Sequence, residues 1–307
     1  MIALDNVGLR ADGKWVLWDV SLELASGEIT GVLGRSDSGK TALARILAGL
    51  DEPTRGGIAF GELGDCEKRI VSVALSTPAV ARELTVFENL EMFASLWGVS
   101  RRGRAREISF LLELMGLSDS RGCRADTLSS GALQRMEIAR ALVADAPVLV
   151  IDSLLDTLGR RLLEKLWDHL LKIRREESKC IIVFTSRGRI AEMCGKITVM
   201  HRGRLMFIGR PDDFRRAAGE DMVVLGDMAD PAVKNRIGEK LSVVVKEEDG
   251  FLSFKVSNGE RAITDLLAEF GSQLNCVYLK RPTLDDALDV IAGGGDGYCV
   301  EASKEVN

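Results

Sequence analysis

The sequence predicts an α/β protein in which helices cover a largely parallel sheet, followed by a smaller α+β domain. Three observations lead to this expectation. Short apolar strands alternate with segments whose apolar residues recur at helical spacing. The pattern changes after about residue 215, and a chain of 307 residues exceeds one ordinary domain. Two domains are therefore expected, in residues 1–215 and 222–292.

The first expected domain, residues 1–215, alternates between strands and helices. Its expected strands are 2–7, 16–24, 28–33, 148–151 and 180–184. Its expected helices are 39–50, most of 84–117, 130–144 and 160–175. Strands separated by helices favour parallel pairing, because the crossover returns the chain to the same end of the sheet.

The second expected domain, residues 222–292, mixes strands and helices in a different order. Its expected strands are 222–225, 241–245, 251–256 and 276–279, with helices near 231–240, 260–270 and 283–292. This order suggests a small α+β domain of ferredoxin-like type. The glycine-rich tail, residues 293–307, is expected to be disordered.

The charge distribution argues against a nucleic-acid partner. From Asp221 onward 9 Lys and Arg oppose 16 Asp and Glu, and before it 32 oppose 30. Neither part carries the excess of cations that nucleic-acid binding requires. The one basic cluster is broken by Gly103 and is interpreted as the solvated start of a helix; its members are Arg101, Arg102, Arg104 and Arg106.

Other features of the composition indicate a cytoplasmic protein. No apolar run approaches the roughly 18 to 20 residues of a membrane span, and the first residues lack the pattern of a signal peptide. The six cysteines are scattered, without metal-ligand spacing, as expected of thiols in a reducing compartment. We therefore expect the chain to reach a membrane only through a partner.

A phosphate-binding loop is the first motif that carries chemistry. The pattern G-x-x-x-x-G-K-[ST] is matched by Gly34, Arg35, Ser36, Asp37, Ser38, Gly39, Lys40 and Thr41. A strand enters this loop and a helix leaves it, so backbone N–H groups and the helix N-terminus can cradle an anion. Lys40 would supply charge to the β- and γ-phosphates, and the Thr41 hydroxyl could ligate Mg²⁺.

A second motif follows at the start of the helix 130–144. The run Leu128-Ser-Ser-Gly-Ala-Leu-Gln-Arg135 opens this helix, and an apolar strand that ends in Asp152 comes after it. Ser-Ser-Gly is also an ordinary helix-capping turn. The two uses are compatible, because the same N-terminal amides can serve both.

Together these motifs resemble those of ATP-binding-cassette (ABC) ATPases, with Ser129 and Gly131 in the signature and Asp152 as the Walker B carboxylate. Residues 222–292, which end in the run from Arg281 to Leu288, are similar to the C-terminal extension of daunorubicin-resistance-type subunits. The resemblance implies the ATP-binding subunit of an ABC-2-class exporter. It implies ATP and Mg²⁺ as cofactors, with Thr41 and Asp152 on the metal. It also implies a membrane permease as partner, on the inner face of the cell membrane.

The sequence departs from the family at positions that sense or activate the γ-phosphate. Asp37 replaces the usual mid-loop glycine. The family's catalytic glutamate, switch histidine, lid glutamine, D-loop aspartate and adenine-stacking aromatic correspond here to Ser153, Arg187, Ser76, Gly159 and Ala11. A serine offers no anionic base at neutral pH, so no residue is assigned as catalytic. The alternative explanation for these apparent replacements is that this sequence is misaligned with the family at these positions.

Family members act as head-to-tail dimers in which one subunit's signature faces the other's phosphate loop. Because the signature positions Ser129 and Gly131 are kept, we expect a homodimer or, in preference, a heterodimer with a competent ABC subunit. The chain would then bind ATP with weak or absent hydrolysis at its own site. The alternative is a non-hydrolysing regulatory or scaffolding ABC subunit. A P-loop kinase or GTPase would leave the signature and the extension unexplained.

Overall fold

The computed structural model describes residues 2–61, 70–217, 219–226, 232–248, 250–271, 274 and 276–293. The chain divides into two compact units, with the division between Pro211 and Asp212. This lies close to the boundary that the sequence predicts between 215 and 222, and helix α7 (Pro211–Ala217) stands there. Of the tail expected to be disordered, Gly293 ends a helix and residues 294–307 lie outside the described residues.

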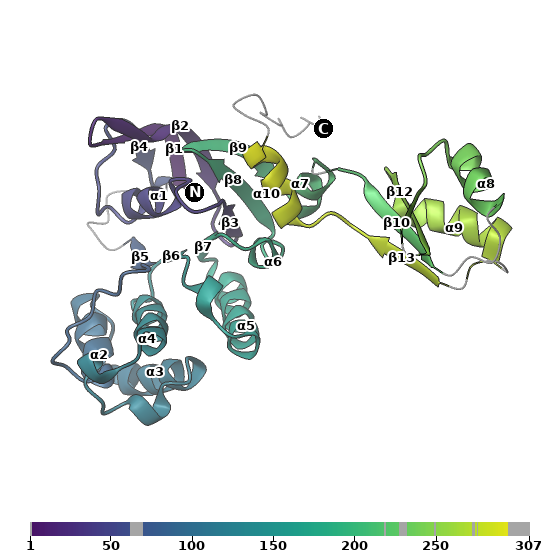
Figure 1. Cartoon of the computed structure of the whole chain (residues 1–307). Helices are drawn as coiled ribbons and strands as arrows, with labels where there is room; N and C mark the ends of the chain where they lie inside the picture. The colour runs from purple at the N-terminus through teal and green to yellow at the C-terminus, as the bar shows by residue number, and fades with distance from the viewer. Residues whose placement is uncertain are drawn as a thin grey trace. The chain divides into compact units, whose positions relative to one another are not determined.

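A six-stranded sheet forms the centre of the first unit (Figure 1). Its strand order is β5-β6-β7-β3-β8-β9, and all neighbours are parallel except the last pair. Along the chain the strands are β3 (Ile29–Leu33), β5 (Val71–Ala74), β6 (Val148–Asp152), β7 (Cys180–Thr185), β8 (Lys196–His201) and β9 (Arg204–Gly209). Strands β3, β6 and β7 are buried along their whole length, as expected of parallel strands covered on both faces.

A second, antiparallel sheet has the order β2-β1-β4, from β1 (Ile2–Ala11), β2 (Lys14–Leu24) and β4 (Arg55–Ala59). Its apolar face shares one core with helix α1 (Lys40–Leu47) and with strands of the parallel sheet. Leu17 and Val20 of β2, Leu43 of α1 and Val150 of β6 are fully buried in this core. The segment that leaves β3 and enters α1 is therefore held between the two sheets.

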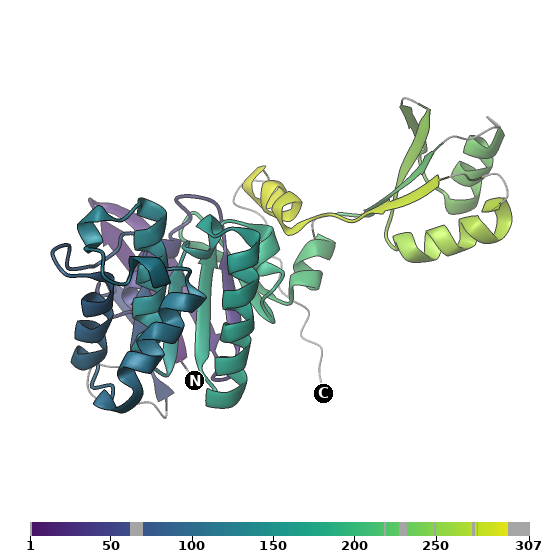
Figure 2. The same ribbon diagram turned by 90° about the horizontal axis from the view of Figure 1, so that it is seen from below.

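The remaining helices of the first unit are α2 (Val86–Leu96), α3 (Arg101–Leu114), α4 (Ser130–Val143), α5 (Arg160–Glu177) and the short α6 (Gly188–Ala191). Helices α2, α3 and α4 pack on one another as a group, seen again from below in Figure 2. Short 3₁₀ turns lie at Ser118–Ser120, Ala125–Thr127 and Leu155–Thr157. Across the described part of the chain, no helix is both long and apolar enough to cross a bilayer.

The prediction for the basic cluster is wrong in one residue. Helix α3 does begin at Arg101, with Ser100 as its cap, and Gly103 has a φ of 88°. Arg104, however, is only 9% exposed and donates to the carbonyl oxygen of Val99. The kink at Gly103 turns this guanidinium back against the preceding loop, so Arg104 serves local structure rather than a solvated face.

The second unit is a four-stranded antiparallel sheet with the order β11-β12-β10-β13. Its elements follow one another as β10 (Asp221–Gly226), α8 (Ala232–Leu241), β11 (Lys246–Glu248), β12 (Phe251–Val256), α9 (Gly259–Phe270) and β13 (Cys276–Lys280). This βαββαβ order, with the first and third strands central, is the ferredoxin-like arrangement that the sequence suggests. Helix α10 (Leu284–Gly293) follows it.

The strand predicted at 241–245 is wrong. Leu241 ends α8, Ser242 has a φ of 54°, and the Val243 N–H donates to the Gly238 carbonyl oxygen at 3.1 Å. These backbone groups close the helix, so strand pairing begins only at Lys246, opposite Ser253. The apolar alternation still has a packing role, because Leu241, Val243 and Val245 contact the core of the unit.

Candidate functional site

The phosphate loop, Gly34 to Thr41, joins the end of β3 to the start of α1. Gly39 has a φ of 98°, and a Cβ there would lie 2.8 Å from the Leu17 side chain. A Cβ on Gly34 would lie 2.6 Å from the Met200 carbonyl oxygen. Both glycines are therefore required by the fold. The turn they permit is closed by the Ser38 N–H, which donates to the Arg35 carbonyl oxygen at 3.3 Å.

Lys40 is buried within this loop. Its Nζ donates to the carbonyl oxygens of Gly34 and Arg35, each at 2.7 Å, and to Ser38 Oγ at 3.3 Å. Burial lowers the pKa of Lys40, and the negative charges of Asp152, Asp156 and Asp37 oppose that shift. These carbonyl acceptors hold the ammonium over the loop, where an incoming phosphate can replace them as its partner.

Thr41 and Asp152 are brought together, as the predicted metal pair requires. The Thr41 hydroxyl donates to Asp152 Oδ2 at 2.8 Å, although the two residues are 111 positions apart. Asp152 is fully buried at the carboxyl end of β6. A hydroxyl and a carboxylate are hard oxygen donors that suit Mg²⁺. Among the described residues, no group of three or more His, Cys, Asp and Glu side chains could hold a metal.

Asp37 adopts a backbone conformation that favours glycine. Its φ is 63°, and its side chain is exposed at the loop with Arg35 and Ser36. Aspartate tolerates this region better than most residues, so the loop keeps its shape. The carboxylate nevertheless adds a negative charge where a phosphate would bind.

We predict that Asp37→Gly raises the affinity for ATP by about tenfold, because it removes one close anion–anion repulsion and the strain of a positive φ. Isothermal titration measures the change. Asp19→Gly is the matched control, since Asp19 also has a positive φ (59°) but lies on β2, outside the loop. An unchanged or lower affinity of Asp37→Gly would show that the carboxylate does not hinder binding.

The signature residues lie at the N-terminus of α4. Ser129 caps this 14-residue helix and accepts the Ala132 N–H at 3.3 Å. Gly131 is exposed, with open space around the position of a Cβ. Within the described residues, no hydrogen bond joins Ser129 or Gly131 to the phosphate loop. Both residues are exposed at the N-terminus of the helix.

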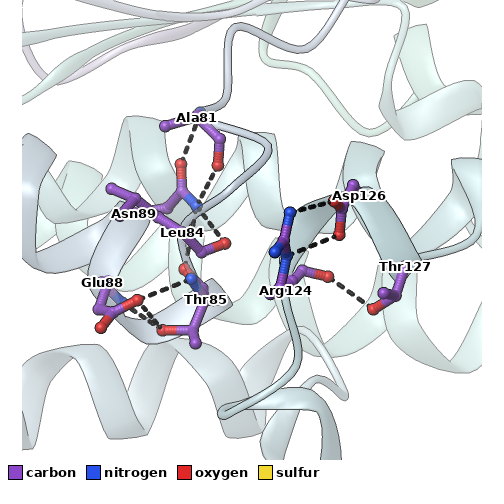
Figure 3. A network of polar contacts seen from close by, with 8 residues as sticks. All are labelled: Ala81, Leu84, Thr85, Glu88, Asn89, Arg124, Asp126 and Thr127. Atoms are coloured by element: carbon purple, nitrogen blue, oxygen red, sulfur yellow. Dashed lines mark hydrogen bonds and ion pairs between the residues drawn. The ribbon is translucent and has the colours of Figure 1, made fainter.

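Polar contacts hold the segment 81–89 at the start of α2 and the segment 124–127 that precedes the signature run (Figure 3). Thr85 and Glu88 cap each other at the start of α2. The Asn89 side chain accepts the Ala81 N–H at 2.8 Å and donates to the carbonyl oxygens of Ala81, Leu84 and Thr85. Leu84 in turn accepts the Ala125 N–H at 3.0 Å, three residues before the signature run begins. Sequence reasoning missed this network, although the T-x-x-E pattern at Thr85 is a capping signal.

Asn89 is 2% exposed, so its loss leaves buried backbone groups without partners. We predict that Asn89→Leu lowers the free energy of unfolding by about 2–3 kcal/mol. Chemical denaturation measures this. Asn235→Leu, on an exposed position of α8, is expected to change it by less than about 0.5 kcal/mol. Equal stability of the two variants would contradict the role of Asn89.

The positions expected to activate water lack a base. Ser153 directly follows Asp152, has a φ of 59°, and donates its hydroxyl to Asp152 Oδ1 at 3.1 Å. Arg187 is exposed at the N-terminus of α6, and Ser76 is exposed after β5. Gly159 precedes α5 and contributes no side-chain cap. A hydroxyl and a guanidinium cannot accept a proton from water at neutral pH.

Sequence reasoning also missed a carboxylate, Asp156, in the 3₁₀ turn after Ser153. It is buried and accepts hydrogen bonds from the Thr185 hydroxyl and from both the N–H and the hydroxyl of Ser186. The last two distances are 2.9 and 2.8 Å. These hydrogen-bond donors to Asp156 all lie in the segment that leads to Arg187, and none of them lies in the phosphate loop.

Comparisons with known proteins agree with this geometry. Residues 17–155 match the profile of the family described as ABC transporter. The sulfate/thiosulfate import ATP-binding protein CysA of Mesorhizobium japonicum is 33% identical over 258 residues, which span 81% of this chain and 72% of that protein. The methionine import ATP-binding protein MetN of Clostridioides difficile is 28% identical over 244 residues, which span 73% of this chain and 76% of that protein.

Solved structures give the same result. An ATP-binding subunit of an ABC transporter superposes with a TM-score of 0.64 at 25% identity and covers 70% of this chain and 92% of its own. The dimeric cassette MJ0796, in a post-hydrolysis state bound to ADP and Pi, superposes with a TM-score of 0.61 at 25% identity and covers 69% and 99%. The chain belongs to the family of ABC transporter ATP-binding subunits.

Proposed function

We propose that this subunit binds Mg-ATP between two cassettes and hydrolyses it weakly or not at all at its own site. Lys40, the loop amides, Thr41 and Asp152 would hold the nucleotide and its metal. The observation that carries the proposal is Ser153, whose hydroxyl donates to the Walker B carboxylate where an acidic base is expected. Mg²⁺, when bound, would neutralise phosphate charge; it would not supply the missing base.

Parallel measurements of binding and turnover on the purified chain test this proposal. We expect Mg-ATP binding that depends on Lys40, with phosphate release at the level of the Lys40→Ala variant. Phosphate release well above that variant, from the chain alone, would contradict weak hydrolysis. Binding without turnover, both alone and with every partner, would favour the regulatory or scaffolding role.

We further propose that the subunit pairs with a competent cassette and donates its signature to that partner's site. The support is the asymmetry within this chain: the water-activating positions are replaced, whereas Ser129 and Gly131 remain accessible at a helix N-terminus. The test uses a second ABC subunit that co-purifies with this chain and carries a glutamate directly after its Walker B aspartate. Gly131→Glu in this chain should abolish the pair's hydrolysis, and Ser153→Ala should leave it unchanged. Full activity of the Gly131→Glu pair would contradict the proposal.

The exporter class is proposed on the resemblance of residues 222–292 to the daunorubicin-type extension, whereas the relatives compared above are named as import proteins. Purification from host membranes provides the test, because we expect the subunit on the cytoplasmic face with an ABC-2-class permease. Recovery with an importer permease would overturn the exporter class and leave the nucleotide proposal intact.

A further inference from the structure

Asp156 is a buried carboxylate that makes no ion pair within the described part of the chain. Its three donors come from two adjacent residues, Thr185, which ends β7, and Ser186, which follows it. The charges of Asp156 and Lys40 attract each other, and the three hydrogen bonds satisfy the buried carboxylate oxygens. The arrangement therefore fixes the segment after β7 more firmly than a neutral side chain would.

This segment ends in Arg187. The Thr185 hydroxyl donates to Asp156 and accepts the Arg187 N–H at 3.0 Å, so the carboxylate sets the hydroxyl's orientation and the hydroxyl sets the Arg187 backbone. The Thr185 carbonyl oxygen accepts the Gly34 N–H at 3.2 Å, at the start of the phosphate loop. Asp156 is thus connected through Thr185 to both the loop and Arg187.

The same turn is tied to the Walker B end of β6. The Ser153 N–H donates to the Phe184 carbonyl oxygen at 2.9 Å, and the Asp156 N–H to the Ser153 carbonyl oxygen at 3.3 Å. Strands β3 and β7 are parallel neighbours with Leu33 opposite Thr185. Their carboxyl ends therefore lie side by side at the same end of the sheet. The phosphate loop follows β3 there, and the segment that contains Arg187 follows β7. The Arg187 side chain is exposed and makes no ion pair within the described residues.

From this geometry we infer that Asp156 is a positioning residue that holds Arg187 for contact with the terminal phosphate of a bound nucleoside triphosphate. Asp156 touches no nucleotide itself. It acts through Thr185 and Ser186, and the pair Asp156–Arg187 sets the preference for ATP over ADP. The inference rests on the proposed function, since it assumes that the loop binds ATP.

Titration of the full-length chain with Mg-ADP and with a non-hydrolysable ATP analogue, whose β–γ bridge is NH, tests the inference. We expect Asp156→Asn and Arg187→Ala each to lower the affinity for the analogue about tenfold and to leave that for ADP unchanged. The double variant should be no weaker than either single variant, because both changes remove one interaction.

Asp221→Asn is the matched control, because Asp221 Oδ2 also accepts a backbone N–H, that of Gly259 at 2.9 Å, in the second unit. Asp221→Asn should leave the ratio of the affinity for the ATP analogue to the affinity for ADP unchanged. If Asp156→Asn does not fold, Ser186→Ala removes one of the three donors, and we expect a smaller loss, about threefold, for the analogue alone.

Two results would overturn the inference: an equal loss of analogue and ADP affinity in Asp156→Asn or Ser186→Ala, or losses that add fully in the double variant. The first would make Asp156 a framework residue, and the second would make it independent of Arg187. Rapid hydrolysis of ATP by the unmodified chain would refute weak turnover instead. It would not alter these affinities, because the analogue is not hydrolysed.

Discussion

Ser153→Glu is expected to raise the rate of phosphate release by the purified chain about 100-fold. A general base typically contributes 10²–10⁴-fold, roughly, and the lower end applies because Ser76 and Arg187 stay as they are. The new carboxylate would follow Asp152 directly, at the carboxyl end of β6 where the phosphate loop also begins. Ser153 already has a φ of 59°, so the substitution requires no change in the backbone conformation at this position.

Steady-state phosphate release under saturating Mg-ATP measures this gain. Ser153→Gln is the control, because it has the same shape as glutamate and offers no base, and it should remain at the unmodified rate. The explanation fails if Ser153→Gln gains as much as Ser153→Glu, since volume rather than proton transfer would then control the rate. It also fails if the unmodified chain is already as fast as Ser153→Glu.

Lys40→Ala is expected to lower the affinity for ATP by about 10- to 150-fold, because the charge-assisted contact to phosphate contributes about 1.5–3 kcal/mol. The Nζ atom is held at the loop by the carbonyl oxygens of Gly34 and Arg35, so its charge lies where the motif places the phosphates. Equilibrium titration with ATP measures the loss.

Lys179→Ala serves as the control for removing a buried lysine. Lys179 is 8% exposed and pairs with Asp145 and Glu177, near the amino end of β7 and therefore far along the strand from Thr185. This variant should bind ATP as the unmodified chain does. If Lys40→Ala binds ATP with unchanged affinity, the loop is not the nucleotide site.

Much of the first unit could be predicted because its signals are local. The strand 28–33, the loop with Lys40 and the helix after it form one contiguous pattern, and the structure has β3 and α1 there. Strand β4 was missed for the opposite reason. β4 contains Gly56 and Gly57 and is formed by pairing with β1, about 50 residues earlier in the chain, so its own composition carries little strand propensity.

Sequence motifs identified those candidate site residues that stand in a motif. A residue that only the fold brings to the site could not be identified from the sequence. Thr41 and Asp152 are 111 residues apart, yet each stands in its own motif, and the structure places them in contact. Asp156 stands in no motif, and its partners Thr185 and Ser186 are 29 and 30 residues away on another strand's end. The predicted strand 241–245 failed because helix capping at Val243 used backbone groups that pairing would have needed.

The most direct test of the central claim is the chemical identity of the nucleotide that the isolated chain holds. The chain is loaded with labelled Mg-ATP, freed of unbound nucleotide, incubated for many multiples of an ordinary turnover time, and quenched, and the bound label is separated into ATP and ADP. Intact ATP is the result we expect, with conversion to ADP in Ser153→Glu. Bound label recovered mainly as ADP from the unmodified chain would contradict the proposal of weak or absent hydrolysis.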